Sequence, residues 1–215
     1  MAYQIRKAVV IGSGTMGGGI AALLAGVGVD VVLLDIPARD TQPGDPPAKR
    51  NAVALEGVKR IQSSRPAQLF AANDLDRIRT GNIDDDLDTV KDADWVIEVV
   101  VERLDVKRAL MAKLAELVAP ETIVSTNTSG LPIRAIAEGM RDDFTCRFLG
   151  THFFNPPRYL RLLEVIPHPN TDPAVVDFIV EYATKVLGKG VVIAKDEPNF
   201  IGNRFMTMSG MQIIN

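Results

Sequence analysis

The chain has 215 residues, enough for one large domain or two small ones. With 47% hydrophobic residues, 24% charged residues and a net charge of −3, the composition excludes a disordered chain and argues against a general nucleic-acid surface, which needs a concentrated basic footprint. One cysteine, Cys146, excludes an intramolecular disulfide framework and a cysteine-rich metal site. Because His152 and His168 are the only histidines, we expect no metal to be bound.

The first residues, MAYQIRKAVVIGSG, lack the layout of a signal peptide, because the apolar run is short and leads straight into glycines. No stretch of the sequence approaches the ~18 consecutive apolar residues of a membrane span. We therefore expect a cytoplasmic protein that does not span a membrane.

Short runs rich in β-branched residues alternate with longer helical stretches along the chain. Several of these runs are continuously apolar, which is typical of parallel strands covered on both faces. The order predicts an α/β fold of the Rossmann type, a doubly wound and mostly parallel sheet with right-handed crossovers. The predicted strands are 8–11, 29–34, 95–99, 122–125, 148–152, 162–166 and 190–193, and the predicted helices are 16–25, 49–62, 106–118 and 173–187.

An irregular segment follows the second predicted strand, since residues 37–47 contain four prolines and cannot form a helix or an interior strand. After it we expect a helical hairpin insertion covering about residues 49–75. The acidic run at 84–88 fits a solvated loop that leads into a short helix better than a metal site, because no fixed ligand spacing supports the latter.

The glycine-rich run GSGTMG at 12–17 lies between a predicted strand and a predicted helix, and an acidic residue ends the next strand 23 residues after the first glycine. This context indicates a dinucleotide-binding turn, in which glycines allow a tight turn and close approach of the pyrophosphate to the helix N-terminus. The acidic residue would bind the adenine ribose and repel a 2′-phosphate, which favours NAD over NADP. A turn that merely joins strand to helix is the alternative. The cofactor-binding residues predicted from this motif are Gly12, Gly14, Thr15, Met16, Gly17 and Asp35.

A further apolar helix is expected to begin near residue 199 and to run through Phe205 and Met208 to Ile213. Such a helix needs a surface to pack on. We therefore predict that residues 1–198 form the dinucleotide-binding domain, that 199–215 are the start of a truncated helical C-terminal domain, and that the exposed helix promotes self-association.

Two polar stretches follow predicted strands. The first, STNTSG at 125–130, fits a ligand-binding segment and a plain turn equally well. The second, THFFNPP at 151–157, contains His152, and a lone histidine after an apolar strand is most often structural. However, Glu164 stands within the apolar strand LLEVIP, where a carboxylate is costly unless it is paired. A turn through the prolines could join the two, and a carboxylate that orients an imidazole suits a general base that deprotonates an alcohol.

Six stretches together resemble the 3-hydroxyacyl-CoA dehydrogenase family, in its order and over nearly the whole chain: GSGTMGGGIA, VVLLD, VVVERLDVK, STNTSG, HFFNPP with LLEVIP, and PNFIGNR. The likeness is to the N-terminal NAD-binding domain and looks closest to the long bacterial type, in which a helical domain and an enoyl-CoA hydratase-like module follow. It implies NAD-dependent oxidation of (S)-3-hydroxyacyl-CoA to 3-ketoacyl-CoA in fatty-acid β-oxidation, and a homodimer formed through the helical domain.

The resemblance also implies roles for single residues. His152 would be the general base and Glu164 its orienting partner, while Ser129 would hydrogen-bond the reacting oxygen and Asn203 would help to hold the substrate. The residues that the family pattern places near the nicotinamide, its ribose or the substrate are Glu102, Lys107, Asn127 and Asn155.

The contact with CoA maps only loosely to residues 49–65, with Lys59 and Arg60 as first candidates, because the proline-rich insertion departs from shorter family members. Two other functions remain open at this point. One is a non-catalytic, crystallin-like NAD-binding protein, and the other is a dehydrogenase of a free hydroxy acid or sugar acid.

Overall fold

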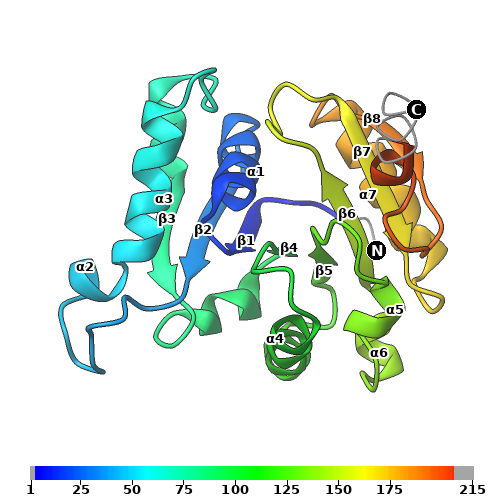
Figure 1. Ribbon diagram of the computed structural model, residues 1–215, viewed down its shortest axis with the longest axis horizontal. Helices are drawn as coiled ribbons and strands as arrows, with labels where there is room; N and C mark the ends of the chain where they lie inside the picture. The colour runs from blue at the N-terminus through cyan, green and yellow to red at the C-terminus, as the bar shows by residue number, and fades with distance from the viewer. Residues whose placement is uncertain (1–2, 206–215) are drawn as a thin grey trace, which may run out of the picture.

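A computed structural model describes residues 3–205 and contains one eight-stranded sheet in the order β3-β2-β1-β4-β5-β6-β7-β8 (Figure 1). All neighbouring strands are parallel except the pair β6 and β7, which is antiparallel. The strands are β1 (Lys7–Ile11), β2 (Asp30–Asp35), β3 (Ile78–Asn82), β4 (Trp95–Glu98), β5 (Ile123–Thr126), β6 (Phe148–Phe153), β7 (Leu162–Pro167) and β8 (Gly190–Ile193). This is the doubly wound α/β fold that the sequence predicts.

The helices divide between the two faces of the sheet, and α1 and α4 lie on opposite sides of it (Figure 1). One apolar layer joins the sheet to α1, α3 and α7, and the other joins it to α4, α5, α6 and η2. The helices are α1 (Thr15–Gly26), α2 (Pro47–Arg50), α3 (Ala52–Ser63), η1 (Ala72–Arg77), η2 (Leu87–Asp92), α4 (Leu104–Leu117), α5 (Ile133–Ile136), α6 (Asp142–Thr145) and α7 (Pro173–Lys185).

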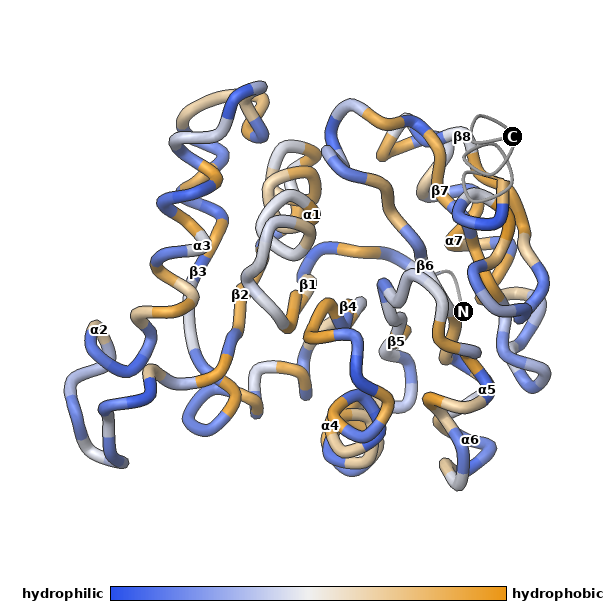
Figure 2. The backbone as a smooth tube through the Cα atoms, in the orientation of Figure 1, coloured by the Kyte–Doolittle hydropathy of each residue, from blue (hydrophilic) through white to orange (hydrophobic). Residues whose placement is uncertain are grey.

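The central strands are buried on both faces, which explains their continuously apolar sequences. Along β1, Ala8 and Val10 pack in one apolar layer while Val9 and Ile11 pack in the other. The covering helices α3 and α4 carry hydrophobic and hydrophilic residues together, as helices with one face on a sheet do (Figure 2). All seven predicted strands are confirmed within about two residues; β3, α5 and α6 were not predicted.

The predicted helical hairpin at 49–75 is wrong in its second arm. Only α2 and α3 are α-helical there, residues 64–71 are irregular, and the 3₁₀ helix η1 follows. Pro66 lacks a backbone N–H and disfavours a helical residue before it. The carbonyl of Ala67 accepts hydrogen bonds from the side chains of Arg158 (2.8 Å) and Tyr159 (2.9 Å) instead of from a helical turn.

The predicted helix at 199 begins later, at Gly202. Asn199 and Phe200 have positive φ angles of 64° and 46°, which a right-handed helix does not contain. Phe205 is 71% exposed, as expected, whereas Met208 and Ile213 lie outside the described residues. Within residues 3–205 no helix combines the length and apolar character needed to cross a bilayer.

Candidate active site

The glycine loop joins the end of β1 to the first turn of α1, where Thr15 and Met16 lie. Gly12 has φ = +108°, and a Cβ there would lie 2.4 Å from the Val99 carbonyl oxygen. A Cβ at Gly17 would lie 1.7 Å from the carbonyl oxygen of Gly12. A Cβ at Gly14 would meet nothing within 4 Å. Gly12 and Gly17 are therefore needed for packing, while Gly14 leaves its surroundings open for a ligand.

The carboxylate of Asp35 lies at the end of β2, beside the glycine loop. Its Oδ2 accepts from the backbone N–H (2.5 Å) and the hydroxyl (2.7 Å) of Ser13, and its Oδ1 accepts from the Ile36 N–H (2.8 Å). A cavity of about 730 Å³ opens here, lined by Gly12, Gly14, Asp35 and apolar side chains of the 99–110 region. An open glycine, a helix N-terminus and a carboxylate around an apolar cavity fit the adenosine and pyrophosphate parts of a dinucleotide.

A second cavity, of about 390 Å³, lies between the glycine loop, α3 and the irregular segment 64–71. Thr15, Arg60, Arg65 and Asn155 are among the residues that line it. Arg60, one of the two candidates for a CoA contact, therefore lines a cavity beside the glycine loop. Lys59 instead is 73% exposed and pairs with Glu56 on the outer surface, so it does not line this cavity.

His152 and Glu164 face each other across the antiparallel pair of β6 and β7. His152 Nδ1 lies 2.7 Å from Glu164 Oε2, and the two residues are only 4% and 1% exposed. Because the carboxylate accepts, Nδ1 carries the hydrogen and Nε2 is left as the basic nitrogen. The contact predicted from the buried carboxylate is confirmed.

The other oxygen of Glu164 is held by the chain beyond β8. Its Oε1 accepts from the backbone N–H groups of Ile201 and Gly202, both at 2.8 Å. The His152 ring also packs 4.4 Å from the ring of Phe154 and 5.9 Å from that of Phe200, measured between centroids. The imidazole and the carboxylate are thus both fixed by contacts on more than one side.

Residues 199–203 also reach the exposed end of the β5 loop. Asn203 Nδ2 donates to the Ser129 carbonyl oxygen at 2.8 Å, and a Cβ at Gly130 would lie 2.6 Å from Asn199 Oδ1. The same short segment therefore joins Glu164 to Ser129. Asn127 lies deeper, where its Oδ1 accepts from the Phe153 N–H at 2.9 Å.

Glu102 and Lys107 take different positions. Glu102 is exposed, and its Oε1 accepts from the Thr128 hydroxyl and from the Ser129 N–H (2.8 Å). Burial would raise the pKa of Glu102, but the hydrogen bonds and the charge of Lys107 together lower it. Lys107 is 1% exposed, and its Nζ lies 2.7 Å from Glu98 Oε1 and 3.2 Å from Glu102 Oε2.

Sequence analysis did not identify Glu98, the last residue of β4, whose carboxylate bonds to residues of both β5 and α4. Besides Lys107, its carboxylate accepts from the Val100 N–H (2.7 Å) and the Thr126 hydroxyl (2.6 Å), and it is fully buried. The signal was present, since Glu98 interrupts an apolar strand just as Glu164 does.

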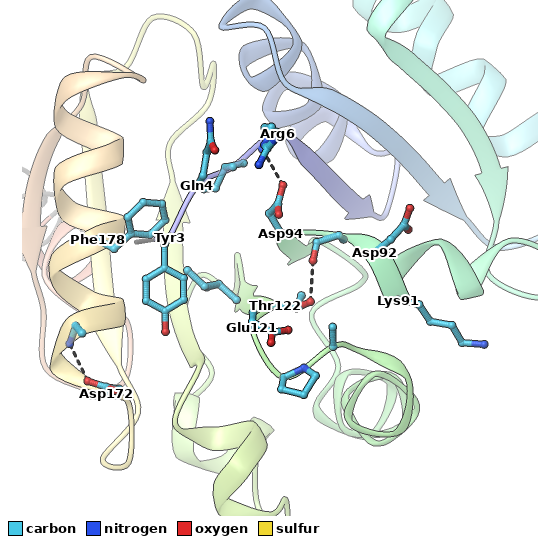
Figure 3. A pocket seen from close by; sticks show the side chains of 16 residues that line it. Tyr3, Gln4, Arg6, Lys91, Asp92, Asp94, Glu121, Thr122, Asp172 and Phe178 are labelled. Carbon is cyan, nitrogen blue, oxygen red and sulfur yellow. Dashed lines mark hydrogen bonds between the residues drawn. The ribbon is translucent and has the colours of Figure 1, made fainter. Parts of the chain in front are cut away.

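A third cavity of about 730 Å³ lies at the opposite edge of the sheet, where β1, β4 and β5 begin (Figure 3). Two of its carboxylates are engaged by the backbone, since Asp94 Oδ2 accepts from the Arg6 N–H at 2.8 Å and Asp172 Oδ1 accepts from the Ala174 N–H at 2.9 Å. We place no active site there. Among residues 3–205 no three potential metal ligands cluster together.

Comparison with known proteins agrees with this geometry. Residues 7–197 match the family model described as 3-hydroxyacyl-CoA dehydrogenase, NAD binding domain. The chain is 47% identical over 215 residues to a probable 3-hydroxyacyl-CoA dehydrogenase of Bacillus subtilis, covering 96% of this chain and 27% of that protein. It is 50% identical over 202 residues to one of Deinococcus radiodurans, covering 94% and 56%.

The solved structures agree as well. The crystal structure of 3-hydroxybutyryl-CoA dehydrogenase from Escherichia coli K12 matches with a TM-score of 0.77 and 36% identity, over 94% of this chain and 40% of that one. The chain spans only about a quarter to just over half the length of the curated relatives named above. The chain belongs to the 3-hydroxyacyl-CoA dehydrogenase family, in which it corresponds to the NAD-binding domain.

Proposed function

We propose that this chain is the NAD-binding part of an enzyme that oxidises (S)-3-hydroxyacyl-CoA to 3-ketoacyl-CoA in fatty-acid β-oxidation. The observation that carries the proposal is the buried contact of 2.7 Å between His152 Nδ1 and Glu164 Oε2. A protein that only stored or bound NAD would gain nothing from burying a carboxylate against an imidazole, because desolvating that charge is costly.

In this proposal His152 is the general base. Its Nε2 takes the proton of the substrate hydroxyl, and Glu164 holds the ring and stabilises the imidazolium that forms. NAD, when bound, supplies the acceptor for the hydride that leaves the carbinol carbon. Ser129 hydrogen-bonds the reacting oxygen and Asn203 holds the substrate.

The cofactor lies along the carboxyl edge of the strands in this proposal. Gly12, Gly14 and Gly17, with Thr15 and Met16, form the pyrophosphate turn at the N-terminus of α1. Asp35 binds the adenine ribose and excludes a 2′-phosphate by charge repulsion.

Four other residues complete the proposed cofactor site. Glu102, Asn127 and Asn155 lie near the nicotinamide, its ribose or the substrate when both are bound. Lys107 is shielded from solvent and acts through Glu102, whose carboxylate lies 3.2 Å from its Nζ.

The second cavity, about 390 Å³, is the proposed entrance for CoA. Two of its lining residues, Arg60 and Arg65, carry positive charge next to the glycine loop, and guanidinium groups suit phosphate.

We also propose a homodimer, formed through a helical domain that continues from residues 199–215, and a cytoplasmic location. Sedimentation of the full-length protein and cell fractionation test these two points.

The proposed activity is tested on the full-length protein by reduction of acetoacetyl-CoA with NADH. We expect His152→Ala to lower the rate by ~10²–10⁴ and to leave the affinity for NADH within a few-fold. Free acetoacetate serves as the comparison substrate. A faster reaction with the free acid would identify a hydroxy-acid dehydrogenase, and tight NADH binding without turnover of either would identify a binding protein.

A further inference from the structure

Ser13, the residue between the first two glycines, directs both of its donors at one oxygen of Asp35. Its backbone N–H lies 2.5 Å and its hydroxyl 2.7 Å from Asp35 Oδ2. The hydroxyl has a single proton, and its other acceptor, the Val53 carbonyl oxygen, is farther away at 3.2 Å. The Ser13 hydroxyl therefore donates its proton to Asp35 Oδ2 and not to the Val53 carbonyl oxygen.

These contacts determine which oxygen of the Asp35 carboxylate can still accept a hydrogen bond from a ligand. Two carboxylate oxygens provide about four acceptor positions in all. Ser13 takes two positions on Oδ2, and the Ile36 N–H takes one on Oδ1 at 2.8 Å. The carboxylate is pinned in one rotamer beside the cavity of about 730 Å³, with its remaining acceptor position on Oδ1.

Ser13 itself is fully buried, and α3 packs against it. A Cβ at Gly57 would lie 2.7 Å from both the Cβ and the carbonyl oxygen of Ser13, so α3 packs directly on it. Arg60 Nη2 donates to the Ser13 carbonyl oxygen at 3.1 Å. Ser13 cannot turn away without displacing α3.

We propose that Ser13 is a positioning residue that sets the choice between NAD and NADP by fixing the Asp35 carboxylate. The inference rests on the proposed role of Asp35 in binding the adenine ribose. A pinned carboxylate accepts from a ribose hydroxyl at its remaining Oδ1 position without first losing rotamer freedom, and it cannot turn aside to admit a 2′-phosphate. Removing the hydroxyl releases the carboxylate, which weakens NAD binding and relieves the repulsion of NADP.

The test is equilibrium titration of the full chain with NADH and with NADPH, for the wild type and for Ser13→Ala. We expect the affinity for NADH to fall roughly tenfold to 150-fold, the range of one hydrogen bond to a charged group. The affinity for NADPH should stay constant or rise, so the ratio of the two falls. Thr41→Ala is the matched control, since it removes a hydroxyl bonded to the Ala38 carbonyl oxygen and should change neither.

A double-mutant cycle shows whether Ser13 acts through Asp35. In the Asp35→Ala background, where residue 35 has no oxygen for Ser13 to bond, Ser13→Ala should change NADH affinity less than about twofold. An unchanged NADH-to-NADPH ratio, or the same loss of NADH affinity in both backgrounds, would overturn the proposal. Ser13→Gly also removes the hydroxyl and gives the same comparison if the alanine variant does not fold. A wild-type chain that binds neither nucleotide would overturn both the Asp35 role and this inference, whereas failure of the His152→Ala test leaves this inference standing.

Discussion

Lys107 Nζ lies 2.7 Å from Glu98 Oε1, and neither side chain is more than 1% exposed. Removing one member of such a pair leaves an uncompensated charge in the interior. Lys107→Met should therefore lower the free energy of unfolding by about 3–5 kcal/mol, measured by urea denaturation. The double variant Glu98→Gln/Lys107→Met should be less destabilised than the single one, because it removes both charges.

The exposed pair Lys185 and Glu181 provides the control for this prediction. Their side chains are 71% and 61% exposed, so Lys185→Met should cost less than about 0.5 kcal/mol. Equal losses for Lys107→Met and Lys185→Met would contradict the assignment of Lys107 to a buried ion pair.

Gly14 and Gly17 should respond in opposite ways to alanine. Gly17→Ala places a methyl group 1.7 Å from the Gly12 carbonyl oxygen, so α1 must shift and stability should fall by about 2 kcal/mol or more. Gly14→Ala meets nothing within 4 Å and should unfold as the wild type does, yet lose NADH affinity at least about tenfold because the methyl group occupies the pyrophosphate position. Thermal unfolding and NADH titration measure both effects. If Gly14→Ala bound NADH normally, the pyrophosphate would have to lie elsewhere.

Glu164→Gln should reverse the tautomer of His152. Both oxygens of Glu164 accept hydrogen bonds, but an amide has only one accepting oxygen. With the oxygen facing the N–H groups of Ile201 and Gly202, the NH₂ group faces Nδ1 and moves the ring hydrogen to Nε2. The base is then lost, and the rate of the full-length enzyme should fall by ~10²–10⁴.

Nitrogen-15 NMR of the imidazoles reads this tautomer directly without relying on turnover. The chain has two histidines, so a His168→Gln variant assigns the spectrum. A His152 ring that kept its hydrogen on Nδ1 in Glu164→Gln would contradict the prediction.

Lys189 should make stability depend on pH. It is 3% exposed, its Nζ donates to the carbonyl oxygens of Pro157 and Leu160, and burial lowers its pKa from 10.5 to about 8. Between pH 8 and 10.5 the unfolded chain binds a proton at Lys189 that the folded chain does not, so this residue makes stability rise with pH there.

The comparison that isolates this effect is wild type against Lys189→Met. The difference in unfolding free energy should be constant below pH 8 and should then shift in favour of the wild type, by up to about 3 kcal/mol, as the pH rises to 10.5. A difference that moves the other way, or does not move, would show that the amine stays charged in the folded protein.

The central fold and the His152–Glu164 contact could be predicted from sequence because burial leaves a strong pattern. Continuous apolar runs identified the central strands, and a carboxylate inside such a run demanded a partner. Strand β3 was not predicted, because Ile78–Asn82, with the sequence IRTGN, has only one apolar side chain. It lies at the edge of the sheet and is held there by its pairing with β2. Glu98 escaped although the same reasoning applied to it.

Tertiary contacts explain the remaining errors. Residues 64–71 are irregular partly because Arg158 and Tyr159, some 90 positions later, bond to the Ala67 carbonyl oxygen. The sequence of residues 64–71 does not by itself predict a contact with residues so far along the chain. The burial of Lys107 likewise depends on Glu98 and Glu102, which local patterning does not place beside it.

The backbone N–H groups of Ile201 and Gly202 on Glu164 have a practical consequence for anyone who wishes to shorten this protein. A cut at residue 198, the boundary suggested by the strand and helix pattern, would spare all the strands within residues 3–205 but remove two of the three hydrogen-bond donors to the carboxylate. The minimal unit for studying the imidazole therefore extends past the sheet to at least Gly202.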